Sequence, residues 1–406
     1  MTVPAATTEG SCGPRREATW QAFLQSQSES LRAAGLWRTI EPLESAPGPT
    51  VRIAGQELLL LCSNNYLGLA TDRRLIAAAT AAAQQLGVGS GASRLLGGTL
   101  ALHEELERRL AALKGCEDCV LFGSGYLANV GTLAALLQPG DTVVSDRLNH
   151  ASIIDGCRLS GAQVCVYPHR DVAAAAQLIE RASGRVLIVT DSVFSMDGDG
   201  APLQELHQLA TRSGALLMVD EAHATGVLGN GLVAHCGLHG QIPVVMGTCS
   251  KALGSVGGFI AGSKLLCGYL RQRARTFFFD TALPPPTVAA TLAALDVIAL
   301  EPERGQRARE LAQRLYLGLR ELGFAAHAPI AAIVPVIFGE SQPALAAAAQ
   351  LRAVGILAPA IRPPTVPAGT ARIRLCTMAT HTDADIAHVL HSFAQLPRNF
   401  RLPAPR

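Results

Sequence analysis

The stretch ALLMVDEAH, residues 215–223, changes within nine letters from a continuous apolar run to the polar residues Asp220, Glu221 and His223. A short apolar run with a polar end is typical of a strand that is buried on both faces of a sheet. The same pattern recurs in CVLFGSG (119–125), TVVSD (142–146), RVLIVTDSVF (185–194) and VVMGTCSK (244–251). We therefore expect strands whose polar ends meet at one edge of a sheet, where ligands bind in folds of this kind.

Helical patterns lie between these runs. In LHEELERRLAALKG (102–115) the leucines recur at three- to four-residue spacing, and Gly115 can end the helix. Strands alternating with helices predict an α/β fold, a mostly parallel sheet with helices on both faces.

Three prolines at 284–286 separate the alternating strands and helices from a different pattern. Long helical patterns follow, then the strand-like runs IAAIVPVIF (330–338) and ARIRLCTMA (371–379), then a final helix. The sequence thus predicts three parts. They are an N-terminal segment at 1–60 with a disordered start, a large domain at 61–289 and a smaller α+β C-terminal domain at 290–406.

The composition excludes several classes of protein. The net charge is +2, and charged residues make up only 16% of the 406 residues, so nothing favours nucleic acid or an anionic membrane. No stretch of about 18 apolar residues predicts a membrane span, and the first residues lack the apolar core of a signal peptide. We expect a cytoplasmic protein. Its ten cysteines are scattered, and the single C-x-x-C at 116–119 has no second pair, so we expect no metal site.

Two motifs suggest other functions. VDEAH (219–223) resembles a helicase motif, but the phosphate loop that such enzymes need is missing. GSGYLA (123–128) fits G-x-G-x-x-A between a strand and a helix, with Asp146 downstream, so a nicotinamide-dependent oxidoreductase stays open as an alternative. The physical content of that motif is only that amides at a helix start bind phosphate, which suits any phosphorylated cofactor.

Asp220, His223 and Lys251 suggest one such cofactor. Asp220 ends a buried strand and needs a cationic partner, which a protonated pyridine nitrogen supplies. Lys251 lies among small residues in MGTCSKALGS (246–255), where loss of water lowers its pKa and makes it a nucleophile for aldehydes. Taken singly, each residue also fits a structural role. Together with the amides of GSGYLA they indicate pyridoxal phosphate.

Seven stretches resemble, in order and spacing, the α-oxoamine synthases, which are fold-type I pyridoxal-phosphate enzymes. They are SNNYLGL (63–69), GSGASR (89–94), DRLNHASIIDG (146–156), VFSMDGDGAPL (193–203), VDEAHATGVLG (219–229), TCSKALGSVGG (248–258) and ARIRL (371–375). The resemblance implies a transferase that joins an amino acid to an acyl thioester with loss of carbon dioxide. RARTFFFDTALPP (273–285) and ATGVLG (224–229) are most similar to the biotin-pathway branch, which uses L-alanine and a pimeloyl thioester on coenzyme A or a carrier protein. Glycine with acetyl-CoA and serine with palmitoyl-CoA are the alternatives within the family.

The resemblance also implies roles for single residues. Lys251 binds the cofactor's aldehyde, Asp220 the ring nitrogen, and Ser195 and His223 the ring hydroxyl, while His150 stacks on the ring. Gly125, Tyr126 and Thr248 bind the phosphate. Arg374 and Thr365 face the amino acid, and Arg38 and Asn64 the acyl thioester.

The resemblance further implies a homodimer with shared sites, in which the segment carrying Thr281 reaches the partner's phosphate. Three positions depart from the family pattern. Asp280 replaces a hydroxyl residue and would repel phosphate, so Thr281 is the expected contact. Ala92 replaces a glycine and would narrow the substrate channel, and Cys249 replaces a leucine.

Overall fold

The computed structural model describes residues 14–400, and the expected disordered start of the chain lies outside the described residues. The chain divides into two units, residues 1–43 and 44–406. Among its described residues, the first unit contains the helix α1 (Pro14–Ala33), and Arg32 in the last turn of this helix lies 4.0 Å from the centre of the Trp37 ring. The other helices and the strands belong to the second unit.

Seven strands form the main sheet, in the order β3-β9-β8-β7-β6-β4-β5. Their bounds are β3 (Asp118–Phe122), β4 (Thr142–Asp146), β5 (Gln163–Tyr167), β6 (Val186–Asp191), β7 (Leu216–Asp220), β8 (Val244–Thr248) and β9 (Gly258–Gly262). The strands run parallel except β9, which is antiparallel to both of its neighbours. The expected mostly parallel sheet is confirmed, and the strands β5 and β9 are additions to the five that the sequence predicted.

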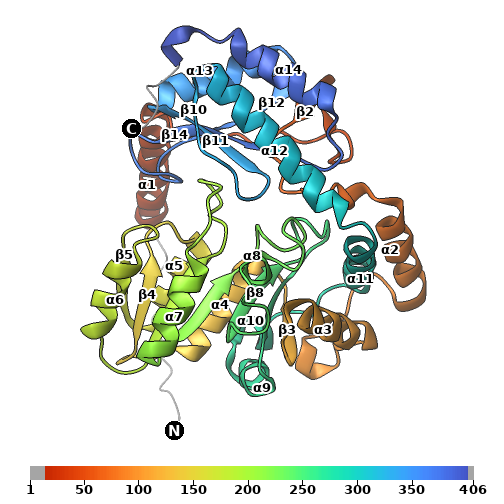
Figure 1. The fold of residues 1–406 in the computed structure, drawn as a ribbon, viewed down its shortest axis with the longest axis vertical. Helices are drawn as coiled ribbons and strands as arrows, with labels where there is room; N and C mark the ends of the chain where they lie inside the picture. Colours follow the sequence, from red (N-terminus) through yellow and green to blue (C-terminus); the bar gives the residue numbers. More distant parts are fainter. Residues whose placement is uncertain (1–13, 401–406) are drawn as a thin grey trace. The chain divides into compact units, whose positions relative to one another are not determined.

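Helices cover both faces of this sheet (Figure 1). They are α2 (Arg73–Leu86), α3 (Ala101–Lys114), α4 (Gly125–Leu136), α5 (Ala151–Ser160), α6 (Val172–Glu180), α7 (Leu203–Ser213), α8 (Leu232–His235), α9 (Lys264–Arg273), α10 (Arg275–Phe278) and α11 (Pro285–Leu300), with short 3-10 turns η1 (Leu69–Thr71) and η2 (Arg94–Leu96). Alternate residues of one strand enter different cores: Leu217 and Val219 pack in one, Met218 in the other. Burial on both faces explains why these strands read as unbroken apolar runs.

A further core, called the smaller core because it is smaller than the two cores of the main sheet together, lies around two small sheets, whose helices are cyan to blue in Figure 1. The sheets are β1 (Thr50–Ile53), β2 (Gln56–Leu60) and β12 (Ile356–Leu357), and β10 (Ala325–Ala326), β11 (Ile333–Gly339), β14 (Ala371–Cys376) and β13 (Ala360–Ile361). The helices are α12 (Glu303–Glu321), α13 (Ser341–Ala353) and α14 (Asp383–Ala394), followed by the turn η3 (Arg398–Phe400). Leu315, Leu351 and Phe393 of the three helices pack on Val336 and Ile373 of the second sheet.

The predicted domain boundary at residue 290 stays a prediction. The core contacts favour a later boundary, because Val288, Ala294 and Leu295 of α11 pack in a core of the main sheet. In the C-terminal part of the chain, the first residue that packs in the smaller core is Leu311 of α12. This core also includes Leu59 and Leu61, from much earlier in the chain.

Membrane-crossing helices and disulfides do not occur in the described part of the chain. No helix within residues 14–400 is both long and apolar enough to cross a membrane. The nine cysteines of this part are free thiols, and within it no three His, Cys, Asp or Glu residues cluster as metal ligands.

A buried ion pair fixes the turn that follows β7. The Lys114 ammonium at the end of α3 donates to Glu221 Oε2 at 2.7 Å, to Thr225 Oγ1 at 2.8 Å and to the Asn230 carbonyl at 2.6 Å. The side chains of Lys114 and Glu221 are 2% and 0% exposed, and Glu221 Oε1 accepts from the amide of Val233 at 2.7 Å. All three ammonium protons are therefore used inside the protein.

We predict that Lys114→Met lowers the free energy of unfolding by about 3–5 kcal/mol, because it leaves the Glu221 carboxylate buried and unpaired. Denaturant titration measures the loss. Lys264→Met, at an exposed lysine, is the control and should change little. The double variant Lys114→Met/Glu221→Gln should recover part of the loss, and no recovery would contradict this explanation.

His169 connects two loops that follow strands β4 and β6 of the main sheet. Its Nδ1 lies 3.0 Å from Asp146 Oδ1 at the end of β4, and its Nε2 lies 2.9 Å from Asp199 Oδ2, four residues after Ser195. Burial by itself lowers the pKa of His169, but the hydrogen bonds and charges of the two aspartates outweigh it and raise the pKa to about 9. The imidazolium therefore persists at neutral pH.

We predict that this connection weakens at alkaline pH. A histidine whose pKa is raised on folding stabilises the protein fully below its unfolded pKa of about 6.5, and that stabilisation is lost as the pH rises through about 9. The free energy of unfolding of the wild type should exceed that of His169→Gln by about 2–3 kcal/mol more at pH 6 than at pH 10. Denaturant titrations at both pH values measure the difference, and a gap independent of pH would show that His169 is held uncharged.

Candidate active site

The carboxyl ends of β4, β6, β7 and β8 bring together most of the residues that the sequence singled out. Asp191 and Asp220 end β6 and β7 as direct neighbours in the sheet. His150 follows β4 and begins α5, and Lys251 lies three residues after β8. Parallel pairing places these strand ends at the same edge, as the sequence predicted.

Lys251 is partly buried at this edge. Its Nζ is 2.9 Å from Nε2 of His223. Burial lowers the pKa of Lys251 to about 8, although the charge of Asp220 acts in the opposite direction. About a tenth of the amine is therefore uncharged at pH 7, and this form can act as a nucleophile or a base.

His223 connects Lys251 to a residue of SNNYLGL that the sequence analysis did not single out. Burial and the nearby Lys251 charge hold the pKa of His223 well below its usual value, so the imidazole is neutral. Its second nitrogen, Nδ1, lies 2.7 Å from the hydroxyl of Tyr66, a fully buried side chain. The ring is thus held at both nitrogens.

Asp220 is held in a fixed orientation. Its Oδ1 accepts from the amide of Ala222 at 2.8 Å, and its Oδ2 accepts from the Asn129 side-chain amide of α4 at 2.8 Å. Burial and the charge of Asp220 raise the pKa of neighbouring Asp191 well above its usual value, so a charge on Asp191 is disfavoured beside Asp220.

His150 begins α5 beside these carboxyl groups. Its backbone amide donates to Asp191 Oδ2 at 2.7 Å, and its Nδ1 lies 2.7 Å from the Ser152 hydroxyl. The side chain is exposed at this edge, yet partial desolvation and the charge of Lys251 lower the pKa of its imidazole. A neutral, accessible ring suits stacking on a flat cofactor.

The start of α4 supplies the amides expected for a phosphate. Ser124 caps the helix by accepting from the Leu127 amide, and Gly125 and Tyr126 are the first helical residues. A Cβ on Gly258 would lie 2.5 Å from the Gly125 nitrogen, so only glycine permits this close backbone approach. Thr248 Oγ1 donates to the Gly257 carbonyl at 2.8 Å on the facing strand end.

Arg374 of β14 reaches this site from the smaller core. Its Nη1 and Nη2 donate to Asn64 Oδ1 at 3.2 and 3.1 Å, Nη2 also donates to the Tyr66 hydroxyl at 3.1 Å, and Nε donates to the Ser195 carbonyl. These acceptors are neutral, so the positive charge of the buried guanidinium can pair with an anionic ligand. In contrast, Arg372 on the same strand forms an ion pair with Asp197 at 2.7 Å.

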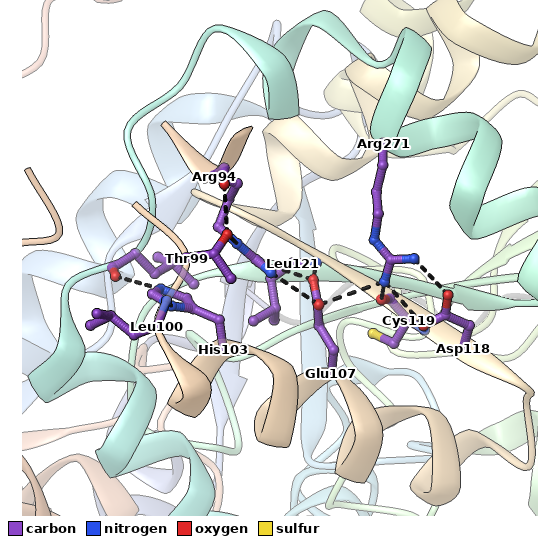
Figure 2. A network of polar contacts seen from close by, with 10 residues as sticks. Arg94, Thr99, Leu100, His103, Glu107, Asp118, Cys119, Leu121 and Arg271 are labelled. Atoms are coloured by element: carbon purple, nitrogen blue, oxygen red, sulfur yellow. Dashed lines mark hydrogen bonds and ion pairs between the residues drawn. The ribbon is translucent and has the colours of Figure 1, made fainter. Parts of the chain in front are cut away.

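A network of ion pairs lies beside the segment that contains Thr281. Figure 2 shows Glu107 of α3 between Arg94 and Arg271. Arg94 donates twice to Glu107 at 3.0 Å, and Arg271 pairs with Asp118 at 2.6 Å. A cavity of about 560 Å³ borders this network, but these charges are paired with one another and offer nothing free to a ligand.

Residues 90–93 pack against residues 280–283 beside that network. The Ala282 amide donates to the Ala92 carbonyl at 3.0 Å, and the Ser90 hydroxyl donates to the Leu283 carbonyl at 2.7 Å. Thr281 itself is exposed, while the Asp280 carboxylate lies against Gly123, just before α4. Asp280 is therefore close to the expected phosphate position.

Two predicted substrate residues, Arg38 and Thr365, lie on other segments of the chain. Arg38 belongs to the first unit. Thr365 lies in an exposed loop between β13 and β14, where its amide donates to the Arg362 carbonyl at 3.0 Å. The roles of both residues stay predictions.

The sequence analysis missed Tyr66, Asn129 and Asp191. Asp191 ends the apolar run RVLIVTD in the same way that Asp220 ends ALLMVD. A polar residue at the end of a predicted strand could therefore have identified both. Tyr66 lies within a quoted motif. Nothing in the sequence marked Asn129, whose contact with Asp220 spans 91 residues and depends on the packing of α4 against the main sheet.

The donors and acceptors of this site fit pyridoxal phosphate. The cofactor needs an amine for its aldehyde, an anion for its protonated ring nitrogen and amides for its phosphate. Lys251, Asp220 and the start of α4 offer these three groups.

Comparison with known proteins agrees with this fit. The pattern of the family "Aminotransferase class I and II" matches residues 56–393. The 8-amino-7-oxononanoate synthase of Anaeromyxobacter dehalogenans strain 2CP-C is 51% identical over 390 residues, covering 94% of this chain and 98% of that protein. The enzyme of the same name from Geobacter metallireducens is 47% identical over 375 residues, covering 91% and 96%.

Solved structures agree as well. A serine palmitoyltransferase from S. paucimobilis with bound PLP and myriocin has a TM-score of 0.86 and 33% identity, covering 91% of this chain and 96% of that one. The fold is that of fold-type I transferases, and the cofactor is pyridoxal phosphate. The chain belongs to the class I and II aminotransferase family and, within it, to the α-oxoamine synthases, alongside enzymes named 8-amino-7-oxononanoate synthase.

Proposed function

We propose that this chain condenses L-alanine with a pimeloyl thioester, with loss of carbon dioxide, to give 8-amino-7-oxononanoate for biotin biosynthesis. The observation that carries the proposal is a sequence identity of 47–51%, over nearly the whole chain, to enzymes of that name. The serine palmitoyltransferase structure is 33% identical, which makes a serine-specific enzyme the weaker candidate. The nicotinamide-dependent alternative loses its support, because Asp146 binds His169 and the family assignment explains GSGYLA.

In this proposal the cofactor lies across the carboxyl ends of the strands. Lys251 binds its aldehyde, Asp220 keeps its ring nitrogen protonated, and His150 stacks on the ring. His223 and Ser195 face the ring hydroxyl. The amides of Gly125 and Tyr126 and the Thr248 hydroxyl hold the phosphate, and Thr281 of a second copy completes that site.

Pyridoxal phosphate, when bound, supplies an aldehyde for the amino group of alanine and a ring that accepts the electron pair left on its α-carbon. Arg374 holds the alanine carboxylate. Lys251, with a pKa near 8, takes the α-proton and later returns a proton to the same carbon. Between these transfers the α-carbon bonds to the acyl carbon, the thiol leaves, and the carboxylate departs as carbon dioxide.

Exposed apolar side chains support assembly as a homodimer with shared sites. Val88 and Leu96 are 81% and 82% exposed on the segment that packs beside Thr281, and Phe279 is 69% exposed two residues before it. Apolar side chains gathered at one place on a surface favour association. We also propose a cytoplasmic location.

A substrate panel tests the proposed reaction. Steady-state kinetics should give the highest kcat/KM for L-alanine with pimeloyl-CoA or a pimeloyl carrier protein, compared with glycine or L-serine and with acetyl- or palmitoyl-CoA. Arg374→Lys should raise the alanine KM about tenfold, since a planar bidentate contact is lost. Arg38→Ala should instead raise the thioester KM. A preference for glycine with acetyl-CoA would refute the biotin-pathway assignment.

The two neighbouring aspartates provide a matched pair of variants. Asp220→Asn removes the charge that keeps the ring nitrogen protonated, so kcat should fall at least about a hundredfold. Asp191→Asn replaces a carboxyl whose charge is disfavoured by burial and by Asp220, so kcat should change only about two- to threefold. Equal losses in both variants would show that the two carboxyl groups act as one unit or only support the fold.

A further inference from the structure

Tyr66 joins the two halves of the proposed site. Its hydroxyl lies 2.7 Å from Nδ1 of His223, 3.1 Å from Nη2 of Arg374 and 3.1 Å from Oδ1 of Asn64. The side chain is 1% exposed, and its burial raises its pKa, so the hydroxyl keeps its proton.

The hydrogen bonds around Tyr66 can be fully accounted for. A Lys251 ammonium can only donate, so His223 Nε2 accepts from it and the neutral ring carries its proton on Nδ1. Nδ1 then donates to the Tyr66 oxygen, which also accepts from Arg374 and donates to Asn64. Both lone pairs and the proton of the hydroxyl are used.

The hydroxyl also suits the other tautomer of His223. When Nε2 must donate, as toward an oxygen anion on the cofactor, the Tyr66 proton can turn from Asn64 to Nδ1. A phenylalanine could serve neither tautomer. It would leave the buried Nδ1 of His223 without a partner and take one acceptor from the Arg374 guanidinium.

We propose that Tyr66 is a positioning residue of the active site, which holds His223 on the cofactor side and Arg374 on the amino-acid side in one fixed arrangement. This inference rests on the proposed function, because it takes Arg374 as the residue that binds the substrate carboxylate. Tyr66 acts through these two side chains and does not itself touch the reacting atoms.

The test uses the holoenzyme and the visible absorption of its bound cofactor. Titration with L-alanine changes that absorption and gives a dissociation constant without any acyl substrate. Tyr66→Phe should weaken alanine binding about tenfold, the value of one hydrogen bond to a charged group, and should lower kcat while the thioester KM stays unchanged. The control is Tyr167→Phe, an equally buried tyrosine at the end of β5 that makes none of the three contacts.

A double variant distinguishes positioning from general loss of stability. If Tyr66 acts through Arg374, Tyr66→Phe/Arg374→Lys should bind alanine within about twofold of Arg374→Lys alone. Additive losses, or a Tyr66→Phe enzyme that binds alanine as tightly as Tyr167→Phe, would overturn the proposal. If Tyr66→Phe does not fold, 3-fluorotyrosine at position 66 keeps the shape and makes the oxygen a poorer acceptor, so a smaller loss of alanine affinity is expected.

The same titration separates this proposal from the proposed function. A wild-type enzyme that responds to glycine or L-serine but not to L-alanine would refute the assignment of the substrate. The Tyr66 comparison is then made with the amino acid that binds, and its outcome still decides the role of the hydroxyl.

Discussion

Asp191 and Asp220 end adjacent buried strands, and two carboxylates so close together cannot both keep a charge. The structure resolves this conflict by local contacts. Burial and the charge of its neighbour raise the pKa of Asp191, while the Asp220 carboxylate accepts two N–H groups. The other polar groups of the site, Lys251, His150 and His223, lie around this carboxylate.

The same edge depends on packing from distant parts of the chain. Lys114 secures Glu221, the residue directly after Asp220, from the end of α3. Arg374 lies on strand β14, and the residues on either side of it, Ile373 and Leu375, belong to the smaller core. Its contacts with Ser195 and Asn64 therefore connect the two cores at the point where an amino acid is expected to bind. Substitutions in the smaller core should therefore weaken the binding of the amino acid before they weaken the binding of the cofactor.

Much of this arrangement could be predicted from the sequence, because strands buried on both faces produce unbroken apolar runs with polar ends. The run ALLMVD gave β7 and Asp220 correctly, and Gly115 does end α3. β9 was missed because GFIAG has glycines at both ends and little strand propensity, and only pairing with β3 and β8 makes it a strand. The contacts of Tyr66 with His223 and Arg374 span 157 and 308 residues. No local pattern carries such information.

The lysines of this chain have a chemical consequence of their own. The sequence contains only three, at 114, 251 and 264, among 34 basic residues. Arginine does not condense with aldehydes under mild conditions, and the Lys114 side chain is buried and paired with Glu221. A reactive aldehyde that meets the folded protein therefore finds few competing side-chain amines besides Lys251, chiefly the exposed Lys264. Such scarcity protects the surface from unwanted adducts, and it would make amine-directed labelling an unusually selective probe of this enzyme.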